Sequence, residues 1–304
     1  MSPPTSRRRG ATLARKLVVP LDGSRLAEAA LPYAVPLADV LGLELVLLRV
    51  ETDVQGHEEA QAYLATITRW LAAANISVQT TQRGESLSEL LLEPPTDIIL
   101  AYVEAKDVAL VVISSHGRSG LSRWVYGSVA HKLVHYSPAP VLVIRSREDD
   151  ATPGATERLP FARQKLHSLL VPLDGSSLSE AILPLLSSVA AGSEASLTLL
   201  RVVPFRVPEL MQEAEAYLQA IQERLQAEGL TVSSAVLVGD TAAEIHDYAR
   251  THACDLIAMS THGSTGLQRW LMGSVAERVL HGTEAPLLLY RPDTHTTAPA
   301  PPAG

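Results

Sequence analysis

Apolar and polar positions along this chain alternate between two periods, and the second half shows this most clearly. Short apolar runs predict five strands there, over Leu169–Val171, Ser196–Val203, Thr231–Val238, Asp255–Met259 and Pro286–Tyr290. Segments with apolar residues three and four positions apart lie between them and predict helices, over Ser176–Ala191, Leu210–Leu225, Thr241–His252 and Gly273–His281. Strict alternation of strand and helix predicts a parallel sheet with helices on both faces.

The first half follows the same order of elements and also repeats individual residues. Asp22-Gly23-Ser24 follows its first predicted strand, and Asp174-Gly175-Ser176 stands 152 positions later. Near the end of each half, residues 114–135 and 260–281 agree at 12 of 22 positions, which include Gly, Ser, His, Arg and Trp. A repeat of about 150 residues is too long for a solenoid and indicates a duplicated domain.

An insertion distinguishes the two copies. The later signature is offset by only 146 positions, so six extra residues precede it in the first half, and they fall near Glu85–Pro95. We therefore expect a disordered arm over 1–14, a domain over 15–146, a linker over 147–166, a second domain over 167–292 and a disordered tail over 293–304.

These patterns predict the fold class. Each half is expected to be an α/β domain with a doubly wound, five-stranded parallel sheet flanked by helices, a Rossmann-like arrangement. A hydrophobic fraction of 46% with only 4% aromatic residues suits a parallel sheet buried on both faces. In such sheets a ligand binds beyond the carboxyl ends of the strands, where the winding direction reverses.

Charge and composition argue against several classes of function. The net charge of −8 argues against nonspecific nucleic-acid binding, and the cluster Arg7-Arg8-Arg9 is interpreted as part of a solubilising arm. No apolar run reaches the roughly 18 residues of a membrane helix, so no membrane association is expected. The single cysteine, Cys254, is interpreted as a small buried residue. A reducing, cytoplasmic location is therefore expected.

Two short segments at predicted strand ends are candidate ligand contacts, and each also has an ordinary structural explanation. The Asp22 and Asp174 carboxylates could accept hydrogen bonds from ribose or adenine groups, although Asp-Gly-Ser is also a common turn with a helix cap. Val50 and Val202 end the second strands and could pack on an adenine ring, but strand packing explains them as well.

The repeated signature is the third candidate. Gly117 permits close backbone approach, and Gly127-Ser128 opens a predicted helix whose unpaired amides suit a phosphate. The second copy repeats these features with Gly263, Gly273 and Ser274. A glycine-rich connection without a ligand is the alternative. His131 and His135 have metal-ligand spacing, but no third ligand is evident and no metal site is expected.

These residues resemble the universal stress protein family over 15–146 and 166–292. The nucleotide-binding pattern of that family is Gly-x2-Gly-x9-Gly-Ser/Thr, and its spacing occurs here from Ser114 to Ser128 and again from Ser260 to Ser274. The resemblance implies an adenine nucleotide alpha hydrolase-like fold that binds ATP. Whether Mg²⁺ binds together with the ATP stays open. It implies nucleotide contacts from Asp22, Val50, Ser114, Gly117, Gly127, Ser128, Asp174, Val202, Gly239, Ser260, Gly263, Gly273 and Ser274.

The resemblance also implies that the two halves pair through their last strands within one chain, while further dimerisation stays open. One departure occurs in both copies, because Ser114 and Ser260 replace the first glycine of the pattern. If that position needs a positive φ, each serine costs about 1–2 kcal/mol. The insertion near Glu85–Pro95 adds a second difference, so we expect two unequal sites, with the second closer to the family pattern.

Three functions remain open at this point. The leading one is an ATP-binding, stress-response regulatory protein with little catalysis, because no strong candidate general base is evident. The second is a scaffold or interaction module that kept the fold without the ligand. The third is a slow ATPase. The fold alone does not choose among them, and the protein partner is unknown.

Overall fold

The protein is described here from a computed structural model, which covers residues 15–50, 57–73, 76–83, 94–115, 127–145, 164–261 and 272–292. The first half contains β1 Lys16–Pro20, α1 Arg25–Glu28, α2 Leu31–Leu41, β2 Glu44–Val50, α3 His57–Ala73, β3 Gln79–Arg83, α5 Pro95–Ala105, β4 Val108–Ser114, α6 Ser128–Tyr136 and β5 Val141–Ile144. The second half contains β6 Ser168–Pro172, α7 Ser177–Glu180, α8 Leu183–Ser193, β7 Ser196–Val203, α9 Pro208–Ala227, β8 Val232–Val238, α10 Thr241–Thr251, β9 Leu256–Ser260, α11 Ser274–Gly282 and β10 Leu287–Tyr290. The predicted α/β alternation is confirmed in both halves.

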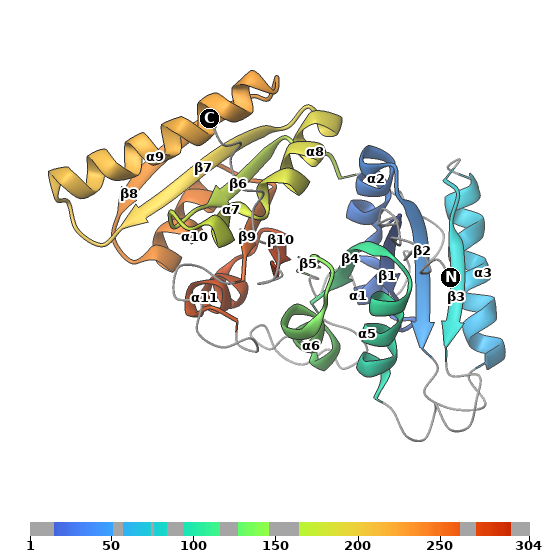
Figure 1. The fold of residues 1–304 in the computed structure, drawn as a ribbon. Helices are drawn as coiled ribbons and strands as arrows, with labels where there is room; N and C mark the ends of the chain where they lie inside the picture. The colour runs from blue at the N-terminus through green and yellow to red at the C-terminus, as the bar shows by residue number, and fades with distance from the viewer. Residues whose placement is uncertain are drawn as a thin grey trace, which may run out of the picture.

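All ten strands form one sheet in the order β3-β2-β1-β4-β5-β10-β9-β6-β7-β8 (Figure 1). Within each half every strand pair is parallel, and the winding direction reverses between β1 and β4 and between β6 and β9. The two last strands, β5 and β10, pair antiparallel, with Leu142 opposite Leu288. The expected pairing of the two halves within one chain is therefore present.

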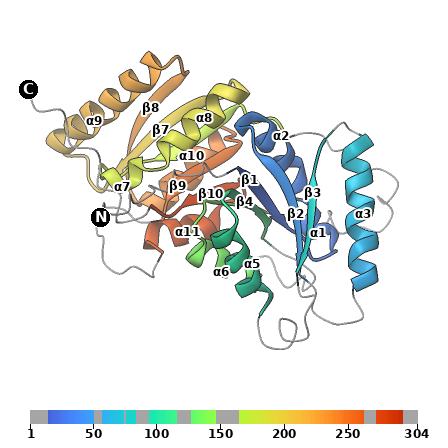
Figure 2. The ribbon, with the colours of Figure 1, turned by 45° about the vertical axis from the view of Figure 1, so that its right-hand side comes forward.

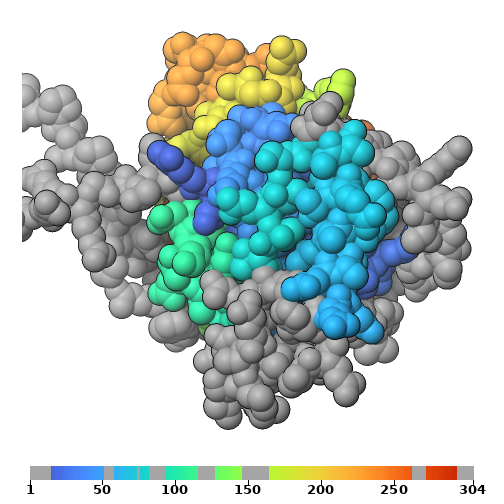
Figure 3. All heavy atoms as spheres, turned by 90° about the vertical axis from the view of Figure 1, so that its right-hand side faces the viewer, coloured from blue at the N-terminus to red at the C-terminus, as the bar shows by residue number. Residues whose placement is uncertain are grey.

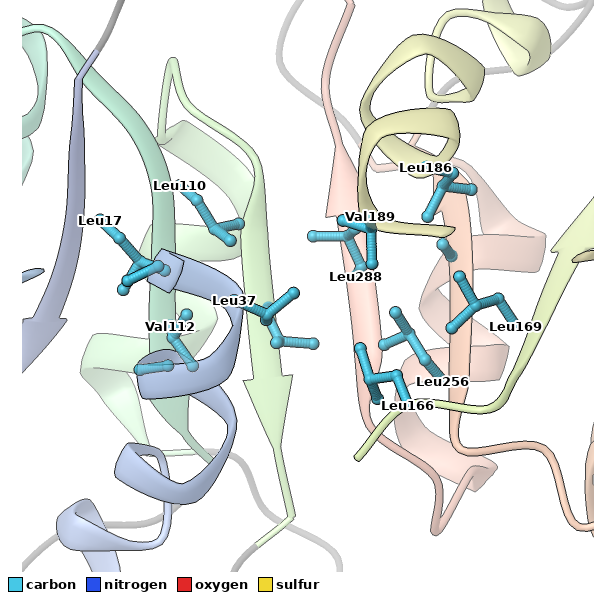
Figure 4. Packing of buried hydrophobic residues seen from close by; sticks show 14 of the residues in the cluster. Leu17, Leu37, Leu110, Val112, Leu166, Leu169, Leu186, Val189, Leu256 and Leu288 are labelled. Carbon is cyan, nitrogen blue, oxygen red and sulfur yellow. The ribbon is translucent and has the colours of Figure 1, made fainter. Parts of the chain in front are cut away.

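The strands are buried on both faces, as the apolar runs predict. Alternate residues of a strand enter different clusters: Leu17 and Val19 face α1 and α2, while Val18 faces α5 and α6. Figure 4 shows the first cluster, which continues from one half into the other; Leu37 of α2 and Leu186 of α8 both contribute to it. In the described ranges, none of the helices combines the length and the apolar character that a membrane crossing requires.

Two sets of contacts join the halves outside the sheet. On one face α2 packs on α8 (Figure 2), and a Cβ added to Gly192 would come within 2.5 Å of Val40 Cγ1, so close packing there requires glycine. Elsewhere, Arg145 donates to the Thr283 carbonyl at 2.5 Å, and Arg291 donates to the His135 carbonyl at 3.0 Å. Each arginine follows the last strand of one half and contacts the end of the last helix of the other.

The structure corrects one predicted element. The helix predicted over Ser176–Ala191 is two helices, α7 and α8, separated at Ala181 and Ile182. Pro184 lies in the first turn of α8, where proline is tolerated, but its missing N–H and its ring oppose a continuous helix.

The long helix α3 forms the outer surface of the first half (Figure 3). Most of the predicted insertion near Glu85–Pro95 lies outside the described residues.

Candidate functional site

The predicted site residues of the second half gather at the carboxyl edge of its strands. The Leu173 amide donates to the Leu200 carbonyl at 2.8 Å, which places the start of the Asp174 turn beside the end of β7. The Gly239 amide donates to the Val203 carbonyl at 3.0 Å, so Gly239 lies next to Val202 on the same edge.

A side-chain contact crosses the point where the winding reverses. Ser260 ends β9, and its Oγ donates to the Ser179 carbonyl of α7 at 3.4 Å. Because the Asp174 turn leads directly into α7, this contact brings the turn and the signature together. Open parallel sheets bind ligands at this position, beyond the carboxyl ends of the strands where the winding reverses.

The Asp-Gly-Ser segments form the same capped turn in both halves. Asp174 Oδ1 accepts from the Ser176 amide at 2.9 Å and from the Ser176 hydroxyl at 2.6 Å, while Ser176 Oγ accepts from the Ser179 amide at 3.1 Å and caps α7. The glycine has a φ of +91°, a left-handed conformation that favours glycine. The segment therefore forms the turn and helix cap that its residue types predict. Asp174 remains exposed at the carboxyl edge of the strands.

The first half copies this turn with one difference. Asp22 Oδ1 accepts from the Ser24 amide at 2.9 Å, and Ser24 Oγ caps α1 by accepting from the Ala27 amide at 3.2 Å. Asp22 is half-buried, whereas Asp174 is exposed. Val50 and Val202 are both half-buried and pack against the α5 and α10 side of the sheet.

The two serines that replace glycine sit at strand ends without strain. Ser114 and Ser260 are buried last residues of β4 and β9, and neither is among the described non-glycine residues with positive φ. The conditional cost of about 1–2 kcal/mol for a positive φ therefore does not arise in this conformation.

Gly127 and Gly273 close the signature segments by a close backbone contact. The Gly127 amide donates to the Ser115 carbonyl at 2.8 Å, and the Gly273 amide donates to the Thr261 carbonyl at 2.7 Å. A Cβ on Gly273 would lie 2.8 Å from that carbonyl oxygen, so glycine is needed for the approach itself. These two amides are thus already bonded, and the donors without a partner in the helix belong to the residues that follow them.

The helices that begin there leave donors at their N-termini. α6 begins at Ser128 and α11 at Ser274, and neither helix has a side-chain cap. The first amides of a helix have no partner within it, and the helix dipole makes this end positive. Both serines are exposed, so their hydroxyls and the first-turn amides form a donor set suited to an anion. The predicted contacts Gly117 and Gly263 lie outside the described residues.

An arginine near the end of the second strand of each half makes side-chain contacts beside the candidate site that sequence reasoning missed. Arg201 is mostly buried, lies over the Tyr217 ring at 5.0 Å and pairs with Glu213 at 3.5 Å. Arg49 is buried and lies over the Tyr63 ring at 5.2 Å. The sequence offered one indication of these contacts, because an arginine interrupts the apolar residues of the second strand in both halves.

Tyr217, the ring under Arg201, connects to α7, the helix that follows the Asp174 turn. The Tyr217 hydroxyl donates to Glu180 Oε1 at 3.1 Å, and burial together with this carboxylate raises the pKa of Tyr217. Glu180 Oε2 also pairs with Arg224 at 3.6 Å. In the first half, burial raises the pKa of the corresponding Glu28 carboxyl.

His131 and His135 stack with their ring centroids 4.3 Å apart, and His135 Nδ1 lies 2.8 Å from the His131 carbonyl oxygen. Burial and the neighbouring imidazoles lower the pKa of His131. Within the described part of the chain, no group of three or more His, Cys, Asp or Glu side chains is arranged to hold a metal ion.

Comparison with known proteins identifies the family of this α/β fold. The model of the universal stress protein family matches residues 14–145 and 165–291. The chain belongs to the universal stress protein family and is a tandem member with two copies of its domain.

Full-length relatives share this tandem organisation. Universal stress protein Rv2005c of Mycobacterium tuberculosis is 26% identical over 303 residues, covering 90% of this chain and 96% of that protein. Universal stress protein Slr1230 of Synechocystis is 24% identical and covers 91% and 100%. The crystal structure of a universal stress protein from Archaeoglobus fulgidus has a TM-score of 0.71 at 19% identity, covering 91% of this chain and 98% of that chain, and supports the fold alone.

Proposed function

We propose that this tandem universal stress protein binds an adenine nucleotide, ATP with Mg²⁺, at the carboxyl strand ends of each half. It would act as a stress-response regulatory protein with little catalysis. Asp22 and Asp174 would contact the nucleoside, and Val50 and Val202 would line the adenine pocket.

One observation carries this proposal. In each half an uncapped helix N-terminus that opens with Gly-Ser lies at the same sheet edge as an Asp-Gly-Ser turn, at the point where the winding reverses. The first-turn amides and the hydroxyl of Ser128 or Ser274 would hold phosphates, since such donors bind anions without a charged side chain. Gly127 and Gly273 would contribute by shaping the approach, because their own amides are bonded to Ser115 and Thr261.

Magnesium fits this donor set only through the nucleotide. The described residues hold no cluster of three carboxylate, imidazole or thiolate ligands. Mg²⁺ keeps several waters and commonly binds substrate phosphates with one or two carboxylates. The ion would therefore arrive with ATP and neutralise part of its phosphate charge.

The test places one negative charge where a phosphate would bind. Ser128→Asp and Ser274→Asp put a carboxylate on the first residue of α6 or α11, which suits the helix dipole and preserves the helix. At about 5–6 Å and an effective dielectric constant of about 20, the carboxylate opposes each phosphate charge by about 3 kcal/mol. That repulsion lowers the affinity about 150-fold.

Calorimetric titration with ATP and Mg²⁺ provides the measurement. We expect two binding sites in the unchanged protein, one in each single variant and none in the double variant. Ala220→Glu adds the same charge on the exposed face of α9 and should bind as the unchanged protein does. Undiminished binding by the double variant, or no heat with the unchanged protein at millimolar ATP, would reject the proposed sites.

A scaffold without a ligand is the second candidate, and a specific observation favours it. The Asp-Gly-Ser segments are complete as capped turns, and Gly273 is explained by its approach to Thr261. If titration shows no binding, these residues have structural roles and the carboxyl edge of the sheet is free for protein contacts.

A further inference from the structure

The second strand of each half carries a charged residue where the strand pattern requires an apolar one. Leu199 and Arg201 point to the same face of β7, and Leu199 is completely buried. Leu47 and Arg49 stand in the same relation on β2, where Leu47 is completely buried. A buried guanidinium loses hydration, so its occurrence in both copies calls for a compensating role.

The guanidinium of Arg201 lies flat beneath the Asp174–Ser176 turn. A Cβ built on Gly175 would be 3.1 Å from both Nη1 and Nη2 of Arg201 and 3.2 Å from its Cζ. Three nearly equal distances mean that the plane of the guanidinium faces the glycine. The turn therefore rests on this group, and a side chain at position 175 would press on it.

Two side chains of α9 hold the guanidinium in this place. Glu213 pairs with it at 3.5 Å, and the Tyr217 ring lies under it at 5.0 Å. The Tyr217 hydroxyl in turn donates to Glu180 of α7 at 3.1 Å. Arg201 and Glu180 thus fix the turn and the helix after it relative to β7 and α9.

Stability alone does not explain the arginine in the first half. Arg49 is 8% exposed, and its Nε and Nη1 are buried without a hydrogen-bond partner in the described part of the chain. Among the described residues no carboxylate pairs with it in the way that Glu213 pairs with Arg201. Unpaired buried donors lower stability, so a residue selected only for stability would not be kept there.

We propose that Arg201 is a positioning residue that orients the Asp174–Ser176 turn toward the nucleoside part of the ligand, and we extend this role to Arg49 only from its equivalent position on β2. This inference rests on the proposed nucleotide site. The arginine acts through the turn and does not contact phosphate. Its loss therefore weakens recognition of the nucleoside and leaves recognition of the phosphate chain unchanged.

The experiment compares ATP with inorganic tripolyphosphate, which has the phosphate chain and lacks the nucleoside. Binding of both is measured in the Ser128→Asp background, so that only the second site reports. Arg201→Met keeps an unbranched apolar side chain, although a shorter one, and removes the charge and the flat face. We expect ATP affinity to fall roughly tenfold, the value of about one hydrogen bond, with tripolyphosphate affinity unchanged.

Two further variants keep the test decisive. Arg201→Lys retains the positive charge beside Glu213 but lacks the planar group, and we expect it to weaken ATP selectively as well, which provides a result if Arg201→Met does not fold. Arg224→Met alters the same network without touching the turn and should bind ATP within about twofold of the background protein.

The outcomes separate this inference from the proposed function. If the background protein binds ATP and a folded Arg201 variant binds it equally well, the positioning role is wrong. An equal loss of ATP and tripolyphosphate also overturns it, because that result indicates a general structural defect. If the unchanged protein binds neither ligand, the proposed function itself fails.

Discussion

Gly175 offers a quantitative test of the contact beneath the turn, because the chain contains a matched control. Gly175 and Gly229 have almost the same φ, +91° and +89°. Replacing either by alanine therefore incurs a similar backbone cost of about 1–2 kcal/mol. At Gly229 no heavy atom lies within 4 Å of the added Cβ, whereas at Gly175 that atom meets the Arg201 guanidinium at 3.1 Å.

The extra cost at Gly175 follows from the contacts that hold the guanidinium. Moving it weakens the contact with the Tyr217 ring, which is worth about 0.5–1 kcal/mol. It also weakens the ion pair with exposed Glu213, which is worth about 0–1 kcal/mol. We therefore expect Gly175→Ala to lower the free energy of unfolding by about 1 kcal/mol more than Gly229→Ala does.

Urea unfolding followed by circular dichroism measures this difference. Both glycines lie in the second half, so both variants report on the same unfolding unit, and the midpoints are compared at a common slope. In an Arg201→Ala background the extra cost of Gly175→Ala should disappear, since the added Cβ meets no guanidinium. Equal costs for the two glycines in the unchanged background, or an extra cost that persists without Arg201, would refute the contact.

Two further predictions concern the domain junction and acid stability. Arg145→Ala and Arg291→Ala each remove hydrogen bonds from a charged group to carbonyls of the other half, and we expect each to lower the free energy of unfolding by about 1–2 kcal/mol in urea titrations. Arg250→Ala, which breaks only an exposed ion pair within α10, is the control and should change it by less than about 0.5 kcal/mol. Asp240 pairs with Arg278 and caps α10, which lowers the pKa of its carboxyl to about 2. Its stabilising effect is thus complete above the ordinary value of 3.8 and is lost as the pH falls toward 2. In Asp240→Asn, which keeps a capping side chain, melting temperatures should depend less on pH in this interval.

The elements with a clear period were predictable, and the departures have local causes. β7 was predicted over its full range because apolar residues continue through it. The helix after Ser176 was predicted as one, because periodicity reports which face is buried and does not report a break in the backbone. The break becomes readable only when Pro184 is taken as a start signal for α8.

The candidate site was only partly predictable. The strand-end turns and the Gly-Ser helix starts follow from residue types and spacing, because those depend on local geometry. The bonding of the Gly273 amide to Thr261 could not be predicted, since it depends on how two separated segments meet. The place of Arg201 beneath Gly175 depends in the same way on the packing of β7 against a turn far away in sequence. The prediction that the second site is closer to the family pattern stays a prediction.

The antiparallel pairing of β5 and β10 has a consequence for the two sites. All strands of one half run opposite to those of the other, so their carboxyl ends face opposite edges of the ten-stranded sheet. One ligand therefore cannot bridge both candidate sites, and duplication here places the two candidates apart. The reciprocal arginine contacts nevertheless join the site edge of each half to the last helix of the other. Arg145 follows β5 on the site edge of the first half and donates to the Thr283 carbonyl at the end of α11, the helix whose start is the proposed phosphate site of the second.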